Sequence, residues 1–303
     1  MSLIMPPKWE DRCDHLIKRA EGGQWDPNYR LDWDSPLALH KTKVQSPLIS
    51  ANLESKWGTL GDDERAEAVR QLLGSLLGNL AVGEVFVDES LTALNEIFPN
   101  KKLHEVLRWQ IIDEVRHAEV LDRYVKKVGW DPRVGDAAAS RLAEATVIAR
   151  QRWETGAMLV MILEIAATAA IQGLRVYCDE PLTHGLLRGI VQDESRHISG
   201  MTVALRAYMP QFDEETKEAI KDTAILGWEQ ALAVTEGPAC EMSDHLDATF
   251  ATAPVNPTTS WPFFRKTLSD VLVPKLKLLG ILDQDLATRL RAVGCPVPTA
   301  AVA

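Results

Sequence analysis

The chain has 303 residues, of which 46% are hydrophobic and 25% are charged, the ordinary balance of a soluble globular protein. Its formal net charge of −10 would repel nucleic acid and anionic membrane surfaces, so we expect neither as a partner. The four cysteines form no C-x-x-C pair, which argues against a zinc ribbon or a disulfide framework and indicates reduced thiols in a cytoplasmic protein.

The N-terminal residues 1–60 carry four tryptophans without sustained periodicity, which predicts an arm wrapped on the body of the protein, with room for short helices. From residue 61 onward the pattern is helical, with capping signals at Asp62 and Asp63. The expected helices span about 62–98, 101–128, 137–178, 181–208, 213–234 and 263–292, with a loop over 252–262. Strand-like alternation is nearly absent, so the predicted fold class is all-α.

We divide the chain into the arm, a helical bundle of residues 61–210, and a C-terminal helical extension of residues 211–303 packed on the bundle. The tryptophan-rich arm would also suit a homodimer. Residues 157–174 are apolar enough to raise the question of a membrane span, but Glu164 lies in their middle and polar helical sequence flanks them. A buried core helix explains this stretch better, so we expect no membrane.

A duplicated cluster of acids, arginine and histidine is the most informative feature. "IIDEVRHAEV" at residues 111–120 and "VQDESRHISG" at 191–200 share the pattern D-E-x-R-H, and a further glutamate lies thirty residues before the glutamate of each pattern. The two resulting sets are Glu84, Asp113, Glu114, Arg116 and His117, and Glu164, Asp193, Glu194, Arg196 and His197. Every member of the first set recurs eighty positions later in the second.

The spacing predicts that the two sets converge. Glu and His at positions i and i+3 lie on one face of a helix. Thirty residues allow a helix out, a turn and a helix back to about the same height. Each half would supply a hairpin in which a lone Glu faces a Glu-x-x-His. Two hairpins packed antiparallel would then bring four carboxylates and two imidazoles to one point in the core.

Charge balance indicates what such a cluster would bind. Glu84 in "LAVGEVFV" and Glu164 in "MILEIAAT" are flanked by apolar residues, and a buried carboxylate is costly unless it is paired or coordinates a metal. Two divalent ions would balance four carboxylates, and oxygen and imidazole ligands suit iron or manganese. The predicted metal ligands are Glu84, Glu114, His117, Glu164, Glu194 and His197.

The remaining members of the two sets have a supporting role in this interpretation. Asp113 would accept a hydrogen bond from the outer nitrogen of His197, and Asp193 one from His117, which fixes each tautomer. Arg116 and Arg196 would neutralise the two aspartates.

Three classes of function fit these residues. The favoured one is a di-iron oxygenase or oxidase that acts on a small organic substrate. The second is a metal-handling ferroxidase or peroxide scavenger without an organic substrate. The third is a helical scaffold or partner-binding protein in which the six residues form a metal-free buried network. A single D-E-x-R-H is most often a solvated helix face with ion pairs, but its repetition with a matched glutamate argues against that interpretation here.

The paired segments "VGEVFV…IIDEVRHAEV" and "LEIAAT…VQDESRHISG" resemble the ferritin-like di-iron oxygenase and oxidase superfamily over about residues 64–208. The D-E-x-R-H form is similar to the hydroxylase subunits of bacterial multicomponent monooxygenases, and the spacing also fits p-aminobenzoate N-oxygenases. The resemblance implies a ferritin-like four-helix bundle with two iron ions or a Mn/Fe pair, and O2 as co-substrate. It also implies a monooxygenase-like or N-oxygenase-like reaction, but it is weak for the substrate. Apolar residues one turn from the ligands would favour a small, hydrophobic or aromatic substrate if they line a pocket, although as core residues at helical spacing they need no such explanation.

Electrons would have to come from an external reductase or ferredoxin, because the chain shows no flavin or nicotinamide fingerprint and no iron–sulfur cysteine set.

The resemblance bears on three further positions. Thr168, one turn after Glu164, falls where the monooxygenases keep a threonine beside the oxygen-binding face, which makes it a catalytic candidate. A hydroxyl bonded to its own i−4 carbonyl is the alternative for Thr168. Leu121 stands where ribonucleotide reductase small subunits carry a radical tyrosine, and Ile190 stands where N-oxygenases carry an extra histidine, so both of those roles are in doubt.

Overall fold

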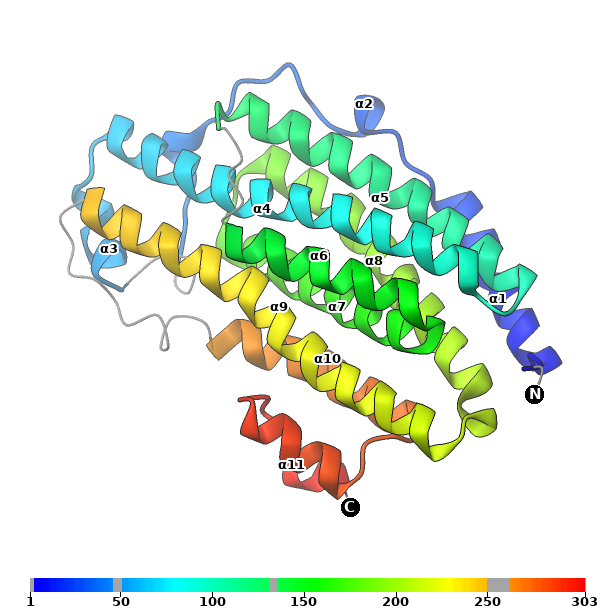
Figure 1. Ribbon diagram of the computed structural model, residues 1–303. Helices are drawn as coiled ribbons and strands as arrows, with labels where there is room; N and C mark the ends of the chain where they lie inside the picture. Colours follow the sequence, from blue (N-terminus) through cyan, green and yellow to red (C-terminus); the bar gives the residue numbers. More distant parts are fainter. Residues whose placement is uncertain (1–2, 46–50, 131–135, 250–261, 303) are drawn as a thin grey trace.

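The computed structural model describes residues 3–45, 51–130, 136–249 and 262–302, and these residues are predominantly helical (Figure 1). The only extended pairing in these ranges is an isolated bridge between Val44 and Cys178. The predicted all-α fold class is confirmed.

Two long helical hairpins form the centre of the molecule (Figure 1). The first consists of α4 (Asp62–Ile97) and α5 (Lys101–Lys127), and the second of α7 (Trp153–Tyr177) and α8 (Pro181–Tyr208). The side chains of Asn100 and Glu180 cap the returning helices α5 and α8 by accepting hydrogen bonds from backbone N–H groups in their first turns. Because α4 packs against α7 and α5 against α8, the two hairpins form one four-helix core.

The most apolar helix, α7, lies inside this core. By length and composition it could cross a membrane, but 78% of its most apolar window is buried within the protein. Burial on all sides explains an almost continuous apolar sequence in a helix that packs against α4, α6, α8, α9 and α10. This placement agrees with the core helix expected over residues 157–174.

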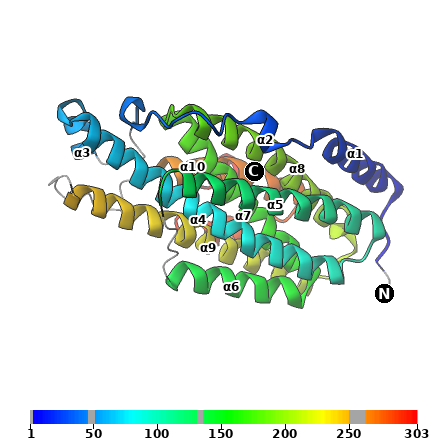
Figure 2. The same cartoon turned by 90° about the horizontal axis from the view of Figure 1, so that it is seen from above.

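The outer helices cover the hairpins. They are α6 (Asp136–Gln151), α9 (Glu214–Thr249), α10 (Pro262–Leu279) and α11 (Gln284–Ala292). From above, α6 lies along the outside of the core, where it packs against α4, α7 and α9 (Figure 2). The short elements are α2 (Pro27–Arg30), α3 (Ala51–Lys56) and the 3-10 helices Leu39–Lys41, Trp57–Thr59, Met209–Gln211 and Thr299–Val302.

The structure corrects several predicted helix boundaries. The single helix expected over 137–178 is two helices, because the backbone of Arg152 is extended and its carbonyl accepts from Gly156 to start α7. The helix expected over 263–292 is broken where Gly280 adopts a positive φ of 77°. The helix expected over 213–234 continues to Thr249. The loop expected over 252–262 lies almost wholly outside the described residues.

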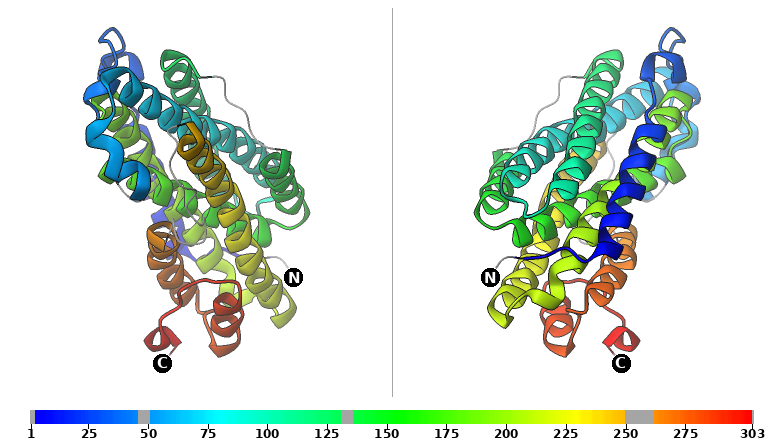
Figure 3. Two further views of the ribbon diagram at one scale, coloured as in Figure 1. Left: turned by 90° about the vertical axis from the view of Figure 1, so that its left-hand side faces the viewer. Right: turned by 90° about the vertical axis from the view of Figure 1, so that its right-hand side faces the viewer.

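The N-terminal arm contains a helix of 17 residues, α1 (Pro7–Gly23), which is longer than the short helices for which the sequence left room. Its buried face consists of Cys13, Leu16, Ile17 and Ala20. This face packs against α5 and α8, and α1 runs beside them in the side views (Figure 3). The residues that follow α1 are thereby held over the centre of the α5–α8 pair.

Candidate metal centre

All six predicted ligands meet inside the four-helix core. Each is at most 3% exposed to solvent. They form two overlapping groups, in each of which one ligand atom per residue lies within 4.8 Å of the others. The groups are Glu84, Glu114, His117 and Glu194, and Glu114, Glu164, Glu194 and His197. The geometry is thus the one that the spacing requires, while the role of these residues as metal ligands stays a prediction.

Glu114 and Glu194 belong to both groups, and each directs one oxygen toward each histidine. Nδ1 of His117 lies 3.2 Å from Oε2 of Glu114 and 3.3 Å from Oε1 of Glu194. Nδ1 of His197 lies 2.9 Å from Oε1 of Glu114 and 3.4 Å from Oε2 of Glu194.

The two remaining glutamates are terminal. An oxygen of Glu84 lies 3.9 Å from Nδ1 of His117, and one of Glu164 lies 3.7 Å from Nδ1 of His197. Two bridging carboxylates and a terminal Glu–His pair at each end are the donor set for two ions side by side.

An outer network holds both imidazoles. Nε2 of His117 lies 3.1 Å from Oδ2 of Asp193, and Nε2 of His197 lies 3.1 Å from Oδ2 of Asp113. These pairs cross between α5 and α8, and they leave Nδ1 of each ring facing the cluster. Arg116 and Arg196 each form ion pairs with both aspartates, at 2.5 to 2.9 Å. Burial acts to raise the pKa of Asp113 and of Asp193, but the hydrogen bond and charge of the paired histidine, aided by the arginines, hold both pKa values below the usual value.

The N-terminal arm completes this network, which sequence reasoning missed. The indole Nε1 of Trp25 donates to Oδ2 of Asp193 at 2.8 Å, and Nε2 of Gln24 donates to Oδ1 of Asp113 at 3.1 Å. The guanidinium of Arg116 donates to Gln24 and lies over the ring of Trp25. Glycine at position 189 makes room for this ring, because a Cβ there would lie 2.6 Å from it.

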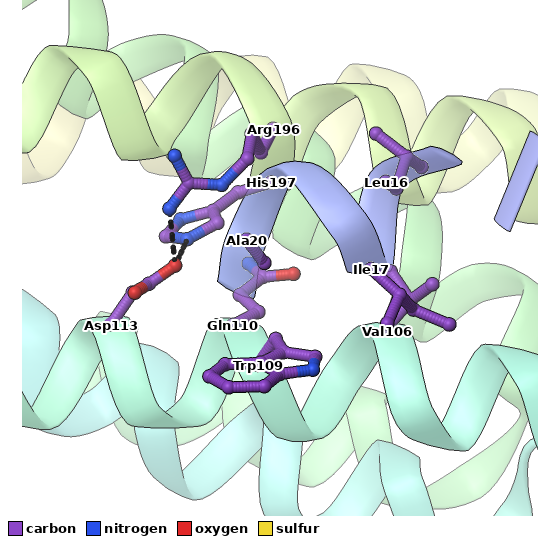
Figure 4. A pocket seen from close by; sticks show the side chains of 9 residues that line it. All are labelled: Leu16, Ile17, Ala20, Val106, Trp109, Gln110, Asp113, Arg196 and His197. Atoms are coloured by element: carbon purple, nitrogen blue, oxygen red, sulfur yellow. Dashed lines mark hydrogen bonds and ion pairs between the residues drawn. The ribbon is translucent and has the colours of Figure 1, made fainter. Parts of the chain in front are cut away.

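A narrow crevice of about 10 Å³ lies between α1, α5 and α8, on the outer side of the Asp113–His197 pair (Figure 4). Apolar side chains of α1 and α5 line it together with Gln110, Asp113, Arg196 and His197. This volume is about that of a single water. The crevice is therefore too small for an organic substrate.

In the metal-free protein the cluster favours bound protons. Burial lowers the pKa of His117 and His197, but the surrounding carboxylates outweigh it and raise both well above the usual value. Burial, together with the charge of Glu114, raises the pKa of Glu84 and Glu164. The two histidines in turn hold the pKa of Glu114 well below the usual value, against the effect of burial.

Unpartnered buried atoms show that the residues fit a metal pair. Oε1 of Glu84, both carboxylate oxygens of Glu194 and Nδ1 of His197 are buried without a hydrogen-bond partner. Such atoms are rare in folded proteins and call for an ion or water. The two arginines balance the two aspartates, so once the cluster loses its protons the four glutamates carry the charge that two divalent ions would neutralise.

Two further polar residues lie one turn from the ligands and were missed from the sequence. The amide Nε2 of Gln110 donates to Oε1 of Glu164 at 2.6 Å. Oδ1 of Asp88, one turn after Glu84, is buried without a hydrogen-bond partner, and burial together with the charge of Glu114 raises the pKa of Asp88. The signal that could have revealed both is their i±4 spacing from ligands on the same helix.

The positions singled out through the family resemblance behave differently from one another. The hydroxyl of Thr168 is buried without a hydrogen-bond partner, so the bond to its own i−4 carbonyl is absent and a catalytic role stays a prediction. Leu121 and Ile190 are buried core residues. The nearby hydroxyl of Tyr124 pairs with that of Thr183 at 2.6 Å at the start of α8.

No known protein family and no curated protein matches the sequence. Solved structures do match. A point mutant of an R2-like ligand-binding oxidase, with an aerobically reconstituted Mn/Fe cofactor, superposes with a TM-score of 0.61 at 14% identity, covering 91% of this chain and 96% of that one. A ribonucleotide reductase R2 subunit from Clostridium botulinum gives 0.55 at 13% identity, covering 88% and 81%.

The chain has a ferritin-like fold. The match covers 91% of this chain, so it extends well beyond the four-helix core. At these identities the likeness establishes the fold, and the chemistry has to be argued from the cluster itself.

Proposed function

We propose that this ferritin-like protein is an oxidoreductase that holds two iron ions, or one manganese and one iron, and uses O2 to oxidise a small organic substrate. The observation that carries the proposal is the buried cluster, in which inward-facing ligand atoms of Glu84, Glu194 and His197 have no hydrogen-bond partner. Oxygen and imidazole donors suit iron and manganese rather than softer metals. The Mn/Fe oxidase with the same fold supports this choice.

The residues of this chain would have distinct tasks. Glu114 and Glu194 would bridge the ions, while Glu84 with His117 and Glu164 with His197 would complete one position each. Asp193 and Asp113 fix the histidine tautomers so that Nδ1 is free to bind metal. The bound metal pair would supply the redox chemistry with O2.

We further propose that electrons come from an external reductase or ferredoxin, and that the substrate is hydrophobic or aromatic. The apolar core around the cluster supports the second point. A monooxygenase-like or N-oxygenase-like reaction is the finer form of the proposal. The residue to test for a role in it is Thr168, whose buried hydroxyl has no hydrogen-bond partner.

Metal content tests the proposal directly. We expect about two ions per chain by elemental analysis, and loss of both in Glu194→Ala, because Glu194 belongs to both donor groups. Glu89→Ala is the matched control, since Glu89 is an exposed glutamate on α4. Unchanged iron and manganese content in Glu194→Ala would contradict the proposal.

A second measurement separates an oxidase from a metal-handling protein. The reduced, metal-loaded protein is exposed to O2 with an excess of Fe²⁺, with and without an external reductant and a panel of apolar aromatic compounds. Oxidation of an aromatic compound supports the proposed function. Repeated turnover of Fe²⁺ alone, with no organic product, would favour a ferroxidase.

A further inference from the structure

The duplication of the ligands does not extend to their neighbours one turn away. Gln110 precedes Glu114 by one turn, and its counterpart eighty positions later, Ile190, precedes Glu194. Both side chains are buried, at 3% and 0% exposure. One half of the bundle therefore presents an amide to the cluster where the other half presents a hydrocarbon.

Only one of the two terminal glutamates, Glu164, accepts a hydrogen bond from the Gln110 amide. Gln110 donates to Oε1 of Glu164 at 2.6 Å, which fixes that carboxylate and leaves Oε2 as the oxygen nearer His197. Oε1 of Glu84 has no hydrogen-bond partner. The side chain of Ile190 has no donor to offer.

We propose that Gln110 is a positioning residue that makes the two metal positions inequivalent. This rests on the proposed function, because it assumes that the cluster binds two ions. The position of Glu164 and His197 is preorganised and fills first. Glu84 must be ordered when the second ion binds beside His117, so that step is weaker.

Mn²⁺ alone is a suitable probe, and binding is a readout that does not depend on catalysis. Metal-free full-length protein is titrated with Mn²⁺ while calorimetry and the electron paramagnetic resonance signal of free Mn²⁺ report stepwise affinity. We expect two steps at least about tenfold apart in the wild type. Partners of metal ligands typically change affinity by about 10- to 100-fold when removed.

The decisive variant is Gln110→Met, which keeps the length of the side chain and removes the donor. We expect the Mn²⁺ affinity of the tighter binding step to fall about 10- to 100-fold, toward the affinity of the weaker binding step. Ile190→Met is the matched control because it places the same side chain at the equivalent position, and both steps should stay as in the wild type. Gln110→Asn, a shorter amide, answers the same question if Gln110→Met does not fold.

Exchanging the two residues gives the sharpest outcome. In a Glu84→Ala background only the Glu164–His197 position remains, and it should show the tighter wild-type constant. In Gln110→Ile combined with Ile190→Gln, the preference should move toward the Glu84–His117 position.

Equal affinities for the two Mn²⁺ steps in the wild type, or wild-type affinities in Gln110→Met and Gln110→Asn, would overturn the inference but leave the proposed metal site standing. Failure of the wild type to bind any Mn²⁺ or iron would overturn the proposed function itself.

Discussion

The inner cluster and the outer network are only one residue layer apart, yet their polar atoms are satisfied in opposite ways. Both oxygens of Asp113 have partners, from Gln24, Arg116, Arg196 and His197. Both oxygens of Glu194 lack a hydrogen-bond partner and have only the ion-pair contacts to the two histidines. The outer network therefore satisfies its polar atoms without a metal, whereas the inner cluster leaves ligand atoms that a metal would bind.

This difference means that the outer network can form when the protein folds, before any metal ion binds to the inner cluster. The outer network joins α5, α8 and the residues that follow α1 through ion pairs and hydrogen bonds that need no metal ion. It can hold the imidazoles in place before an ion arrives, which is the preorganisation that a precise metal site requires. The inner glutamates would then destabilise the empty protein, because buried unpartnered acceptors are costly.

Of the changes that test this contrast, removal of the metal should have the largest effect on the stability of the protein. At free metal about 100 times the dissociation constant, each ion adds about 2.7 kcal/mol of stability, or about 5 kcal/mol for two. We expect the melting temperature to fall on the order of 10 °C in the metal-free protein, with helical circular dichroism retained because the outer network persists.

Thermal unfolding with and without a chelator measures this effect, and Glu194→Ala should show no metal-dependent shift. If the metal-free protein is as stable as the metal-loaded protein, the polar atoms of the inner cluster are stabilised by one another and need no metal ion.

A change of pH should have the next largest effect. The surrounding carboxylates raise the pKa of His117 and His197, and burial raises that of Glu84 and Glu164. The empty cluster therefore carries protons near neutral pH, and metal must displace them. Below these raised pKa values, affinity should fall about tenfold per pH unit for each proton displaced.

Calorimetry with Mn²⁺ in buffers of different ionisation enthalpy counts the protons released. Affinity that does not change between about pH 6 and pH 8 would contradict the pKa directions given above.

Sequence reasoning could reach the inner cluster because its geometry is encoded locally. The i, i+3 spacing of Glu114 and His117 puts both on one helix face, and the thirty-residue interval returns the chain to Glu84. Duplication at eighty residues then supplied the second half and the crossed Asp–His pairs. The convergence of all six side chains could therefore be inferred from the spacing and the repeat within residues 84–197 alone.

The features that were missed depend on contacts between distant segments or on unmarked breaks. Trp25 meets Asp193 across 168 positions of sequence, and no local periodicity signals that contact. The break at Arg152 lacks the glycine or proline that usually marks a helix end, since the chain reads "ARQRWETG" there. Tertiary packing, rather than local pattern, decides both.

Trp25 offers the finest test of the contrast, because it belongs to the outer network and its indole N–H acts on the inner cluster through Asp193. Trp25→Phe removes the indole donor, while Asp193 keeps Arg116, Arg196 and His117. We expect a loss of stability of about 1 to 2 kcal/mol. We also expect metal binding to weaken by about tenfold, because His117 is held less firmly.

Trp33→Phe is the matched control. Trp33 is a buried tryptophan of the same arm, and its indole donates at 2.9 Å to the backbone carbonyl of Pro27, which belongs to the arm and not to the cluster. It should lose similar stability in thermal unfolding but keep its metal affinity, since it removes a hydrogen bond of the same kind outside the network. Equal metal affinity in the two variants would mean that the arm only packs against the bundle, and that the aspartates and arginines suffice to hold the imidazoles.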